Sequence, residues 1–344
     1  MLLTFYTFIN NSTPATNMKR SVLGAIGVGL ATIIIVIIII TQPGSLPKST
    51  EFPSQETMMP QPLSSRIKVI ASFYPLYEFS KNIAGEKAEV SVFTPIGIEP
   101  HDWEPSTGDL IALKESDVFV YNGGGMEPFV EKIIDSGEYS NVLFVETTHG
   151  LDPITSDHDE SDHAEEHDSM YDPHTWLDPM LAKEQVIVIK NALLKVDADN
   201  AQYYEDNANT YSIKLDDLDS KIKTELSNCK KNTIVPFHNA FTYFGNRYGI
   251  KIHSLSGIVP ESEATASELK ELVDYIKQNQ INVVFAEELV DPKLAQVLAD
   301  EAGAQILLLS PLEGVSQDEL AAGTSYIAKM EENLKNIKIA LECT

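Results

Sequence analysis

The pattern of hydrophobic and polar positions changes several times along this chain. Residues 21–40 are uncharged and almost entirely apolar. A helix of this length spans roughly 30 Å, the thickness of the hydrocarbon core of a membrane. A cleaved signal peptide is the alternative, but its apolar region would be shorter. We therefore expect a transmembrane anchor at residues 21–40. Because Lys19 and Arg20 precede it, residues 1–20 are predicted to be cytoplasmic.

Residues 41–65 contain five prolines and few large apolar residues. Such a segment buries too little surface to order itself, so we expect a disordered linker. From Arg66 onward, short apolar runs alternate with amphipathic stretches, which is typical of β-α units around a largely parallel sheet. The predicted strands cover residues 68–73, 89–93, 118–121, 142–145, 233–236, 251–255, 283–286 and 305–309.

The predicted helices alternate with these strands, and the strand pattern breaks once near the middle of the chain. The helices begin at residue 74 and cover 106–115, 126–136, 179–196, 200–229, 240–248, 265–279 and 292–302, with a last one from about residue 317. The helix within the break would be about 40 Å long. We predict an α/β fold with two (β/α)4-type lobes, at residues 66–198 and 230–344, joined by a rigid linking helix at 199–229.

The charge balance limits the classes of partner. The chain has 51 acidic and 25 basic residues, a formal charge of −26, which would repel a nucleic-acid backbone. We therefore expect no nucleic-acid partner and regard cations as natural ligands, although the charge could serve solubility alone. Cys229 and Cys343 match no metal motif, and they could form one disulfide in an oxidising compartment.

One segment of the first lobe is especially rich in ionisable residues. Residues 157–168 read DHDESDHAEEHD and include His158, His163 and His167. Because it has almost no apolar side chain, we expect residues 154–170 to form a solvated loop. Its histidines and carboxylates predict an auxiliary role in capturing cations. A charged insertion without a metal role is the alternative.

Three other histidines, His101, His174 and His238, each follow a proline by one or two positions. Proline restricts its own backbone and that of the residue before it, so each histidine lies on a stiff, non-helical loop. These loops lie at the ends of β-α units, where ligands of open α/β sheets collect. We predict one metal site in the cleft between the lobes. Three imidazoles favour Zn²⁺ over Mn²⁺, which prefers more oxygen ligands. His149 and His253 are interpreted as structural or surface residues.

Four segments resemble signature regions of the ZnuA/TroA-like (cluster A-I) solute-binding proteins of metal ABC transporters. They read TPIGIEPHDWEPSTGD at 94–109, DPHTWLDP at 172–179, PFHNAFTYFGNRYGI at 236–250 and VVFAEELVDP at 283–292. The resemblance covers roughly residues 66–344. It implies a Zn²⁺ or Mn²⁺ ion between two lobes, with His101, His174 and His238 as the nitrogen ligands, and an ABC permease as partner. The acidic loop is similar to that of the zinc members.

The fourth ligand position stays open at this stage. The family usually supplies an aspartate after the last strand, and this sequence has Ser310 there. Either a water held near Ser310 or the carboxylate of Glu313 could complete the site. Glu99 and Asp172 each precede a predicted ligand by two positions. They could accept hydrogen bonds from the imidazoles, or they could only cap turns.

These observations predict a membrane-anchored extracytoplasmic receptor that binds Zn²⁺ with high affinity and delivers it to an ABC permease, without catalysis. A manganese receptor of the same family is one alternative. Another is a zinc-dependent hydrolase or lyase with an open fourth coordination position, although no H-E-x-x-H pair or obvious general base accompanies the ligands. A third is a cell-adhesion protein that carries an incidental metal.

Overall fold

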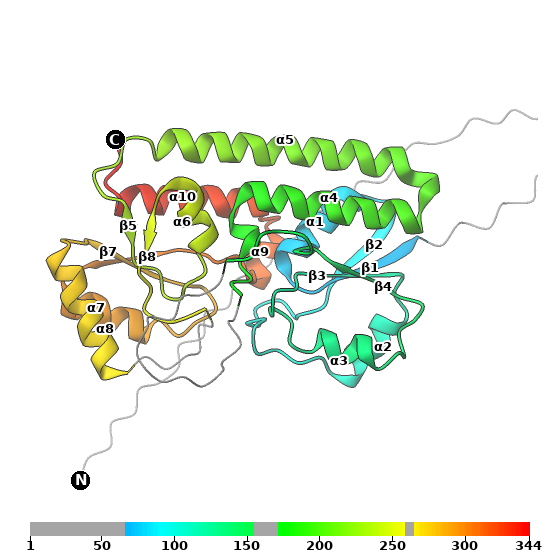
Figure 1. Ribbon diagram of the computed structural model, residues 1–344, viewed down its shortest axis with the longest axis horizontal. Coiled ribbons are helices and arrows are strands. Elements are labelled where there is room, and N and C mark those ends of the chain that lie inside the picture. Colours follow the sequence, from blue (N-terminus) through cyan, green and yellow to red (C-terminus); the bar gives the residue numbers. More distant parts are fainter. Residues whose placement is uncertain (1–65, 155–170, 259–264) are drawn as a thin grey trace, which may run out of the picture. The chain divides into compact units, whose positions relative to one another are not determined.

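The computed structural model describes residues 66–154, 171–258 and 265–344, which lie within one compact unit (Figure 1). The predicted cytoplasmic segment, transmembrane anchor and linker fall outside the described residues. So does nearly all of the predicted loop at 154–170, with His158, His163 and His167. Within the described ranges, no helix combines the length and the apolar character needed to cross a membrane.

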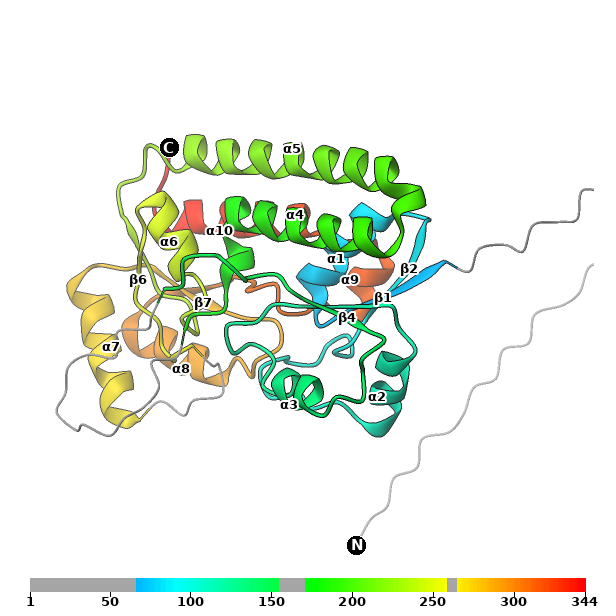
Figure 2. The same ribbon diagram turned by 45° about the vertical axis from the view of Figure 1, so that its right-hand side comes forward.

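The first lobe is built on a parallel sheet with the strand order β2-β1-β3-β4. The strands are β1 (Ile67–Ala71), β2 (Ala88–Val92), β3 (Val118–Tyr121) and β4 (Leu143–Glu146). The connecting helices are α1 (Tyr74–Ala84), α2 (Thr107–Lys114) and α3 (Val130–Asp135). Successive strand residues point to opposite faces. Val69 and Val118 therefore belong to the core that contains α1 residues, and Ile70 and Phe119 belong to the one that contains α2 and α3 residues. Figure 2 shows α1 on one side of the sheet and α2 and α3 on the other.

Two long helices follow the first sheet. A 3₁₀ turn, η1 (Thr175–Leu177), leads into α4 (Pro179–Val196), and η2 (Ala198–Asn200) leads into α5 (Ala201–Glu225). The Asp178 carboxylate caps α4 by accepting a hydrogen bond from the Met180 backbone N–H at 2.9 Å. At 25 residues, α5 is about 37 Å long. It lies along α4 and also packs on α1 and α10 (Figure 1).

The second lobe contains two pairs of parallel strands. They are β5 (Thr233–Ile234) with β6 (Lys251–Ile252), and β7 (Val283–Ala286) with β8 (Gln305–Leu308). The helices are α6 (Thr242–Tyr248), α7 (Ala266–Gln278), α8 (Lys293–Ala302), α9 (Gln317–Ala321) and α10 (Tyr326–Ala340). The predicted α/β fold class is confirmed. The prediction of one continuous last helix is wrong, because Gly323 adopts a φ of 75° and Ser325 caps a new helix.

One large hydrophobic core runs through both lobes. It contains α1, α4 and α5 residues together with Phe241 and Phe244 from the second lobe and Tyr326 from α10. A smaller core lies between β7, α7 and α8. A disulfide between Cys229 and Cys343 links the segment after α5 to the C-terminal end. The two lobes are therefore joined by continuous packing as well as by α5.

Candidate metal centre

His174 is held by the loop that precedes η1. The Asp172 Oδ1 atom accepts one hydrogen bond from the His174 backbone N–H at 2.9 Å and another from its ring Nδ1 at 2.7 Å. Both residues are buried. Because an ionised carboxylate can only accept, Nδ1 carries a proton, which leaves Nε2 as the nitrogen that can bind a metal. Asp172 thus orients the imidazole, one of the two roles that the sequence left open for it.

His238 follows β5 and has the same arrangement with a different carboxylate. Its ring Nδ1 lies 2.8 Å from both carboxylate oxygens of Glu287, and its backbone N–H donates to Glu287 Oε1 at 3.1 Å. Glu287 directly follows β7 and is buried. Glu287 is not among the site residues predicted from the sequence. The available signal was a carboxylate directly after a buried strand, at the sheet edge where ligands collect.

His101 lies on the loop between β2 and α2 and is 8% exposed. The Glu99 Oε1 atom accepts a hydrogen bond from the His101 backbone N–H at 2.9 Å. The hydrogen bond that Glu99 accepts from this residue therefore comes from its main chain, as in a turn cap, and not from its ring. Glu99 supports the loop, whereas Asp172 and Glu287 support imidazole rings.

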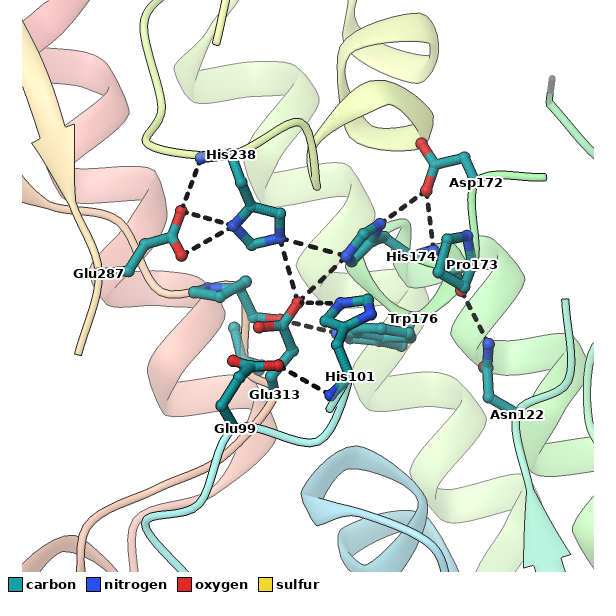
Figure 3. Close-up of polar contacts among 12 residues, drawn as sticks. Glu99, His101, Asn122, Asp172, Pro173, His174, Trp176, His238, Glu287 and Glu313 are labelled. Atoms are coloured by element: carbon teal, nitrogen blue, oxygen red, sulfur yellow. Dashed lines mark hydrogen bonds and ion pairs between the residues drawn. The ribbon is translucent and has the colours of Figure 1, made fainter. Parts of the chain in front are cut away.

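Glu313, on the segment after β8, completes the group (Figure 3). Its Oε1 atom lies 3.3 Å from His101 Nε2, 3.1 Å from His174 Nε2 and 3.2 Å from His238 Nε2. The Nε2 atoms of His174 and His238 are 3.2 Å apart. These four residues are all buried, and they form the one cluster with metal-ligand geometry found among the described residues.

Ser310 lies in the turn that precedes Glu313. Its hydroxyl oxygen accepts a hydrogen bond from the Leu312 backbone N–H at 3.2 Å. Leu312 adopts a φ of 59°, which is strained for a leucine, and its side chain is buried. Ser310 therefore stabilises the turn that directs the next residue, Glu313, toward the three histidines.

The spacing of these four atoms suits a small tetrahedral cation. In a regular tetrahedron with metal–ligand distances of about 2.0–2.1 Å, the ligand atoms are about 3.3–3.4 Å apart. Four of the six separations among these atoms are 3.1–3.3 Å, and all six are within 4.8 Å. A cavity beside the cluster, lined partly by Glu99 and Glu313, has a volume of about 10 Å³. That volume holds about one water molecule, and none of the three histidines lines it.

The electrostatics of the cluster favour a positive charge. Burial alone would lower the pKa of His174, but the carboxylates of Asp172 and Glu313 outweigh burial and raise it. The pKa of His238 is likewise raised against burial, by Glu287 and Glu313. Burial alone would raise the pKa of Glu313, yet the three imidazoles hold it well below its usual range. In the absence of a bound cation, protons on His174 and His238 therefore provide the positive charge beside these carboxylates.

The fold and the site together define a two-lobed α/β binding protein with a buried, nitrogen-rich candidate cation site between its lobes. Such a site can hold and release an ion. The chain belongs to the ZnuA family, described as the periplasmic component A of a zinc-uptake complex, whose family model matches residues 69–340. The resemblance drawn from the four sequence segments is thereby confirmed.

Individual relatives agree with the family. The chain is 38% identical over 286 residues to the high-affinity zinc uptake system protein ZnuA of Bacillus subtilis strain 168, covering 80% of this chain and 88% of that protein. It is 36% identical over 277 residues to the zinc-binding lipoprotein AdcA of Streptococcus pneumoniae, covering 79% of this chain but only 55% of AdcA.

Solved structures of relatives share the fold. The Zn(II)-bound ZnuA-like domain of AdcA from Streptococcus pneumoniae has a TM-score of 0.70 and 34% identity, with 80% of this chain and 99% of that chain covered. The laminin-binding protein Lmb of Streptococcus agalactiae has a TM-score of 0.71 and 30% identity, with 80% and 99% covered. Lmb is described as a bifunctional protein with adhesin and metal transporting activity.

Proposed function

We propose that this chain is an extracytoplasmic receptor that binds one Zn²⁺ between its lobes with high affinity and delivers it to an ABC permease. The observation that carries the proposal is the convergence of three imidazole Nε2 atoms on one carboxylate oxygen at 3.1–3.3 Å, with all four atoms within 4.8 Å of one another. The proposed ligands are His101, His174, His238 and Glu313. The zinc-uptake family and its zinc-binding relatives supply the transport context.

The chemistry of the ligand set favours zinc over manganese. Imidazole nitrogen suits the borderline-soft Zn²⁺ ion, whereas Mn²⁺ favours sites richer in carboxylate and water oxygen. Asp172 and Glu287 strengthen the preference, because hydrogen bonds to Nδ1 make the imidazoles more basic donors. We also propose that the apolar run at residues 21–40 tethers the receptor to the membrane.

The hydrolase alternative has less support than the receptor. Catalytic zinc needs an open coordination position for water or substrate. With Glu313 at the fourth corner, a bound ion would have four protein ligands, which is typical of a closed site. The family match is to a transport component. The adhesin alternative rests on the descriptions of laminin-binding relatives, whereas the family match is to a zinc-uptake component, so we propose metal transport as the principal role.

Elemental analysis of the purified protein tests this proposal. The protein is stripped with a chelator, offered equimolar Zn²⁺ and Mn²⁺, and separated from free metal. We expect one zinc and essentially no manganese per chain, and we expect His174→Ala to lose stoichiometric zinc. His149→Ala is the matched control, since His149 is exposed and lies outside the cluster. Preferential uptake of manganese, or unchanged zinc affinity in His174→Ala, would overturn the assignment.

A further inference from the structure

The hydroxyl of Tyr243, on α6, lies directly behind the His174 loop. It accepts a hydrogen bond from the Ile154 backbone N–H at 3.0 Å and donates one to the Asp172 backbone oxygen at 3.0 Å. The Asp172 backbone N–H in turn donates to the Ile154 oxygen at 2.9 Å. These three hydrogen bonds form a closed ring, and Tyr243 is only 5% exposed.

This ring fixes the backbone of Asp172 on both sides. Its N–H is held by Ile154, and its carbonyl oxygen is held by Tyr243. The carboxylate of the same residue orients the His174 ring, so Tyr243 acts on that ring through a single residue. A phenylalanine at position 243 could pack its ring in the same way. The additional hydroxyl of Tyr243 is favourable only because it has hydrogen-bond partners, since burying a hydroxyl without partners costs free energy.

Helix α6 also connects two of the proposed ligands. It begins at Thr242, shortly after His238. One turn beyond Tyr243, the side chain of Arg247 pairs with Asp178, which caps α4 at the far end of the His174 loop. The helix therefore holds this loop at both ends while its N-terminal side carries His238. Helix α6 therefore links the segment bearing His238 to the loop bearing His174.

We propose that Tyr243 is a positioning residue for zinc binding: its hydroxyl fixes Asp172, and Asp172 in turn keeps His174 Nε2 directed at the ion. This inference rests on the proposed function. Partners of this kind, which hydrogen-bond a metal-ligating histidine or its carboxylate, typically affect metal affinity by about 10- to 100-fold. Because Tyr243 acts through Asp172, its effect falls at the lower end of that range.

The test is Tyr243→Phe, which removes one oxygen atom and retains the ring. We expect the zinc affinity to fall about tenfold. The matched control is Tyr248→Phe on the same helix, because the Tyr248 hydroxyl donates to Asp219 of α5 at 3.1 Å. We expect this control to bind zinc within about twofold of the wild-type protein. Thermal unfolding of the metal-free proteins verifies that both variants fold.

A double-mutant cycle separates positioning from a general structural effect. If Tyr243 acts through Asp172, adding Tyr243→Phe to Asp172→Ala lowers zinc affinity no further. Co²⁺ bound in place of zinc gives a second measurement, because its visible absorption depends on coordination geometry. We expect that spectrum to change in Tyr243→Phe and to be unchanged in Tyr248→Phe.

Three outcomes would overturn the inference. They are wild-type affinity in Tyr243→Phe, a full tenfold loss that persists in the Asp172→Ala background, and an equal loss in Tyr248→Phe. Each leaves the proposed function intact as long as the wild-type protein binds zinc. A wild-type protein that takes up no zinc would instead refute the proposed function itself, so the two failures are distinguishable.

Discussion

The hydrogen bonds between Glu287 and His238 allow a graded prediction of zinc affinity. Glu287 accepts from the ring Nδ1 with both oxygens, each at 2.8 Å, and both side chains are buried. Hydrogen bonds to charged groups contribute about 1.5–3 kcal/mol. Since about 1.4 kcal/mol corresponds to a factor of ten, removing this interaction should weaken zinc binding by about 10- to 100-fold. That range agrees with measured effects of carboxylates that support metal-ligating histidines.

Two substitutions of Glu287 should give losses of zinc affinity at the two ends of this range. In Glu287→Gln, the amide oxygen can still accept from Nδ1 but the negative charge is lost, so we expect about a tenfold loss of affinity. In Glu287→Ala, the Nδ1 proton is buried without a partner, so we expect about a 100-fold loss. The affinities are measured by competition with a chelator of known zinc affinity at constant pH. The predicted order is wild type, then Gln, then Ala.

The neighbouring residue is the matched control for this series. The Glu288 carboxylate pairs with Lys329 on α10 instead of with a histidine. Glu288→Gln should therefore reduce the stability of the protein while changing zinc affinity by no more than about threefold. Equal affinity in all three Glu287 proteins would refute the reasoning. So would a loss in Glu288→Gln as large as that in Glu287→Gln.

Three further predictions follow from the same structure. The pKa values of His174 and His238 are raised in the metal-free site, so zinc must displace protons there. Zinc affinity should therefore fall as pH falls, by about tenfold per pH unit for each proton displaced. Zinc titrations from about pH 8 to about pH 5.5 measure this slope. Zinc at about 1,000 times its Kd should stabilise the fold by about 4 kcal/mol, visible as a higher Tm by calorimetry. Replacing Cys229 and Cys343 by serine should lower the free energy of unfolding by about 2–5 kcal/mol in urea titrations, with little effect on zinc affinity.

The order of strands and helices could be predicted because it depends on local periodicity. The run Val283–Ala286 is buried on both faces, which is what an uninterrupted apolar stretch predicts for a parallel strand. The helix starting at Pro179 could also be predicted, since Asp178 and Pro179 form a local capping signal. Boundaries were less accurate. The helix expected at 200–229 ends at Glu225, and strands β5 and β6 are shorter than expected.

Site contacts could be anticipated only where the two partners are close in sequence. Asp172 lies two positions before His174, so the sequence suggested their contact. Glu287 is 49 positions from His238, and only the arrangement of β5 beside β7 brings the two together. Glu313 was left undecided because its direction depends on the left-handed backbone of Leu312, a conformation that the sequence does not reveal.

Hydrogen bonds that do not involve an ion join the loops that carry the proposed ligands. The Trp176 indole N–H donates to the Pro311 oxygen at 2.7 Å, which joins the His174 loop to the segment bearing Glu313. Glu287 joins the end of β7 to His238. These bonds hold the four proposed ligand atoms within 4.8 Å of one another, with four of the six separations at 3.1–3.3 Å. A small cation that displaces the protons of His174 and His238 can then bind with little rearrangement, so little of its binding energy is lost to ordering the site. This is the physical reason why ligands from distant loops can form a tight site.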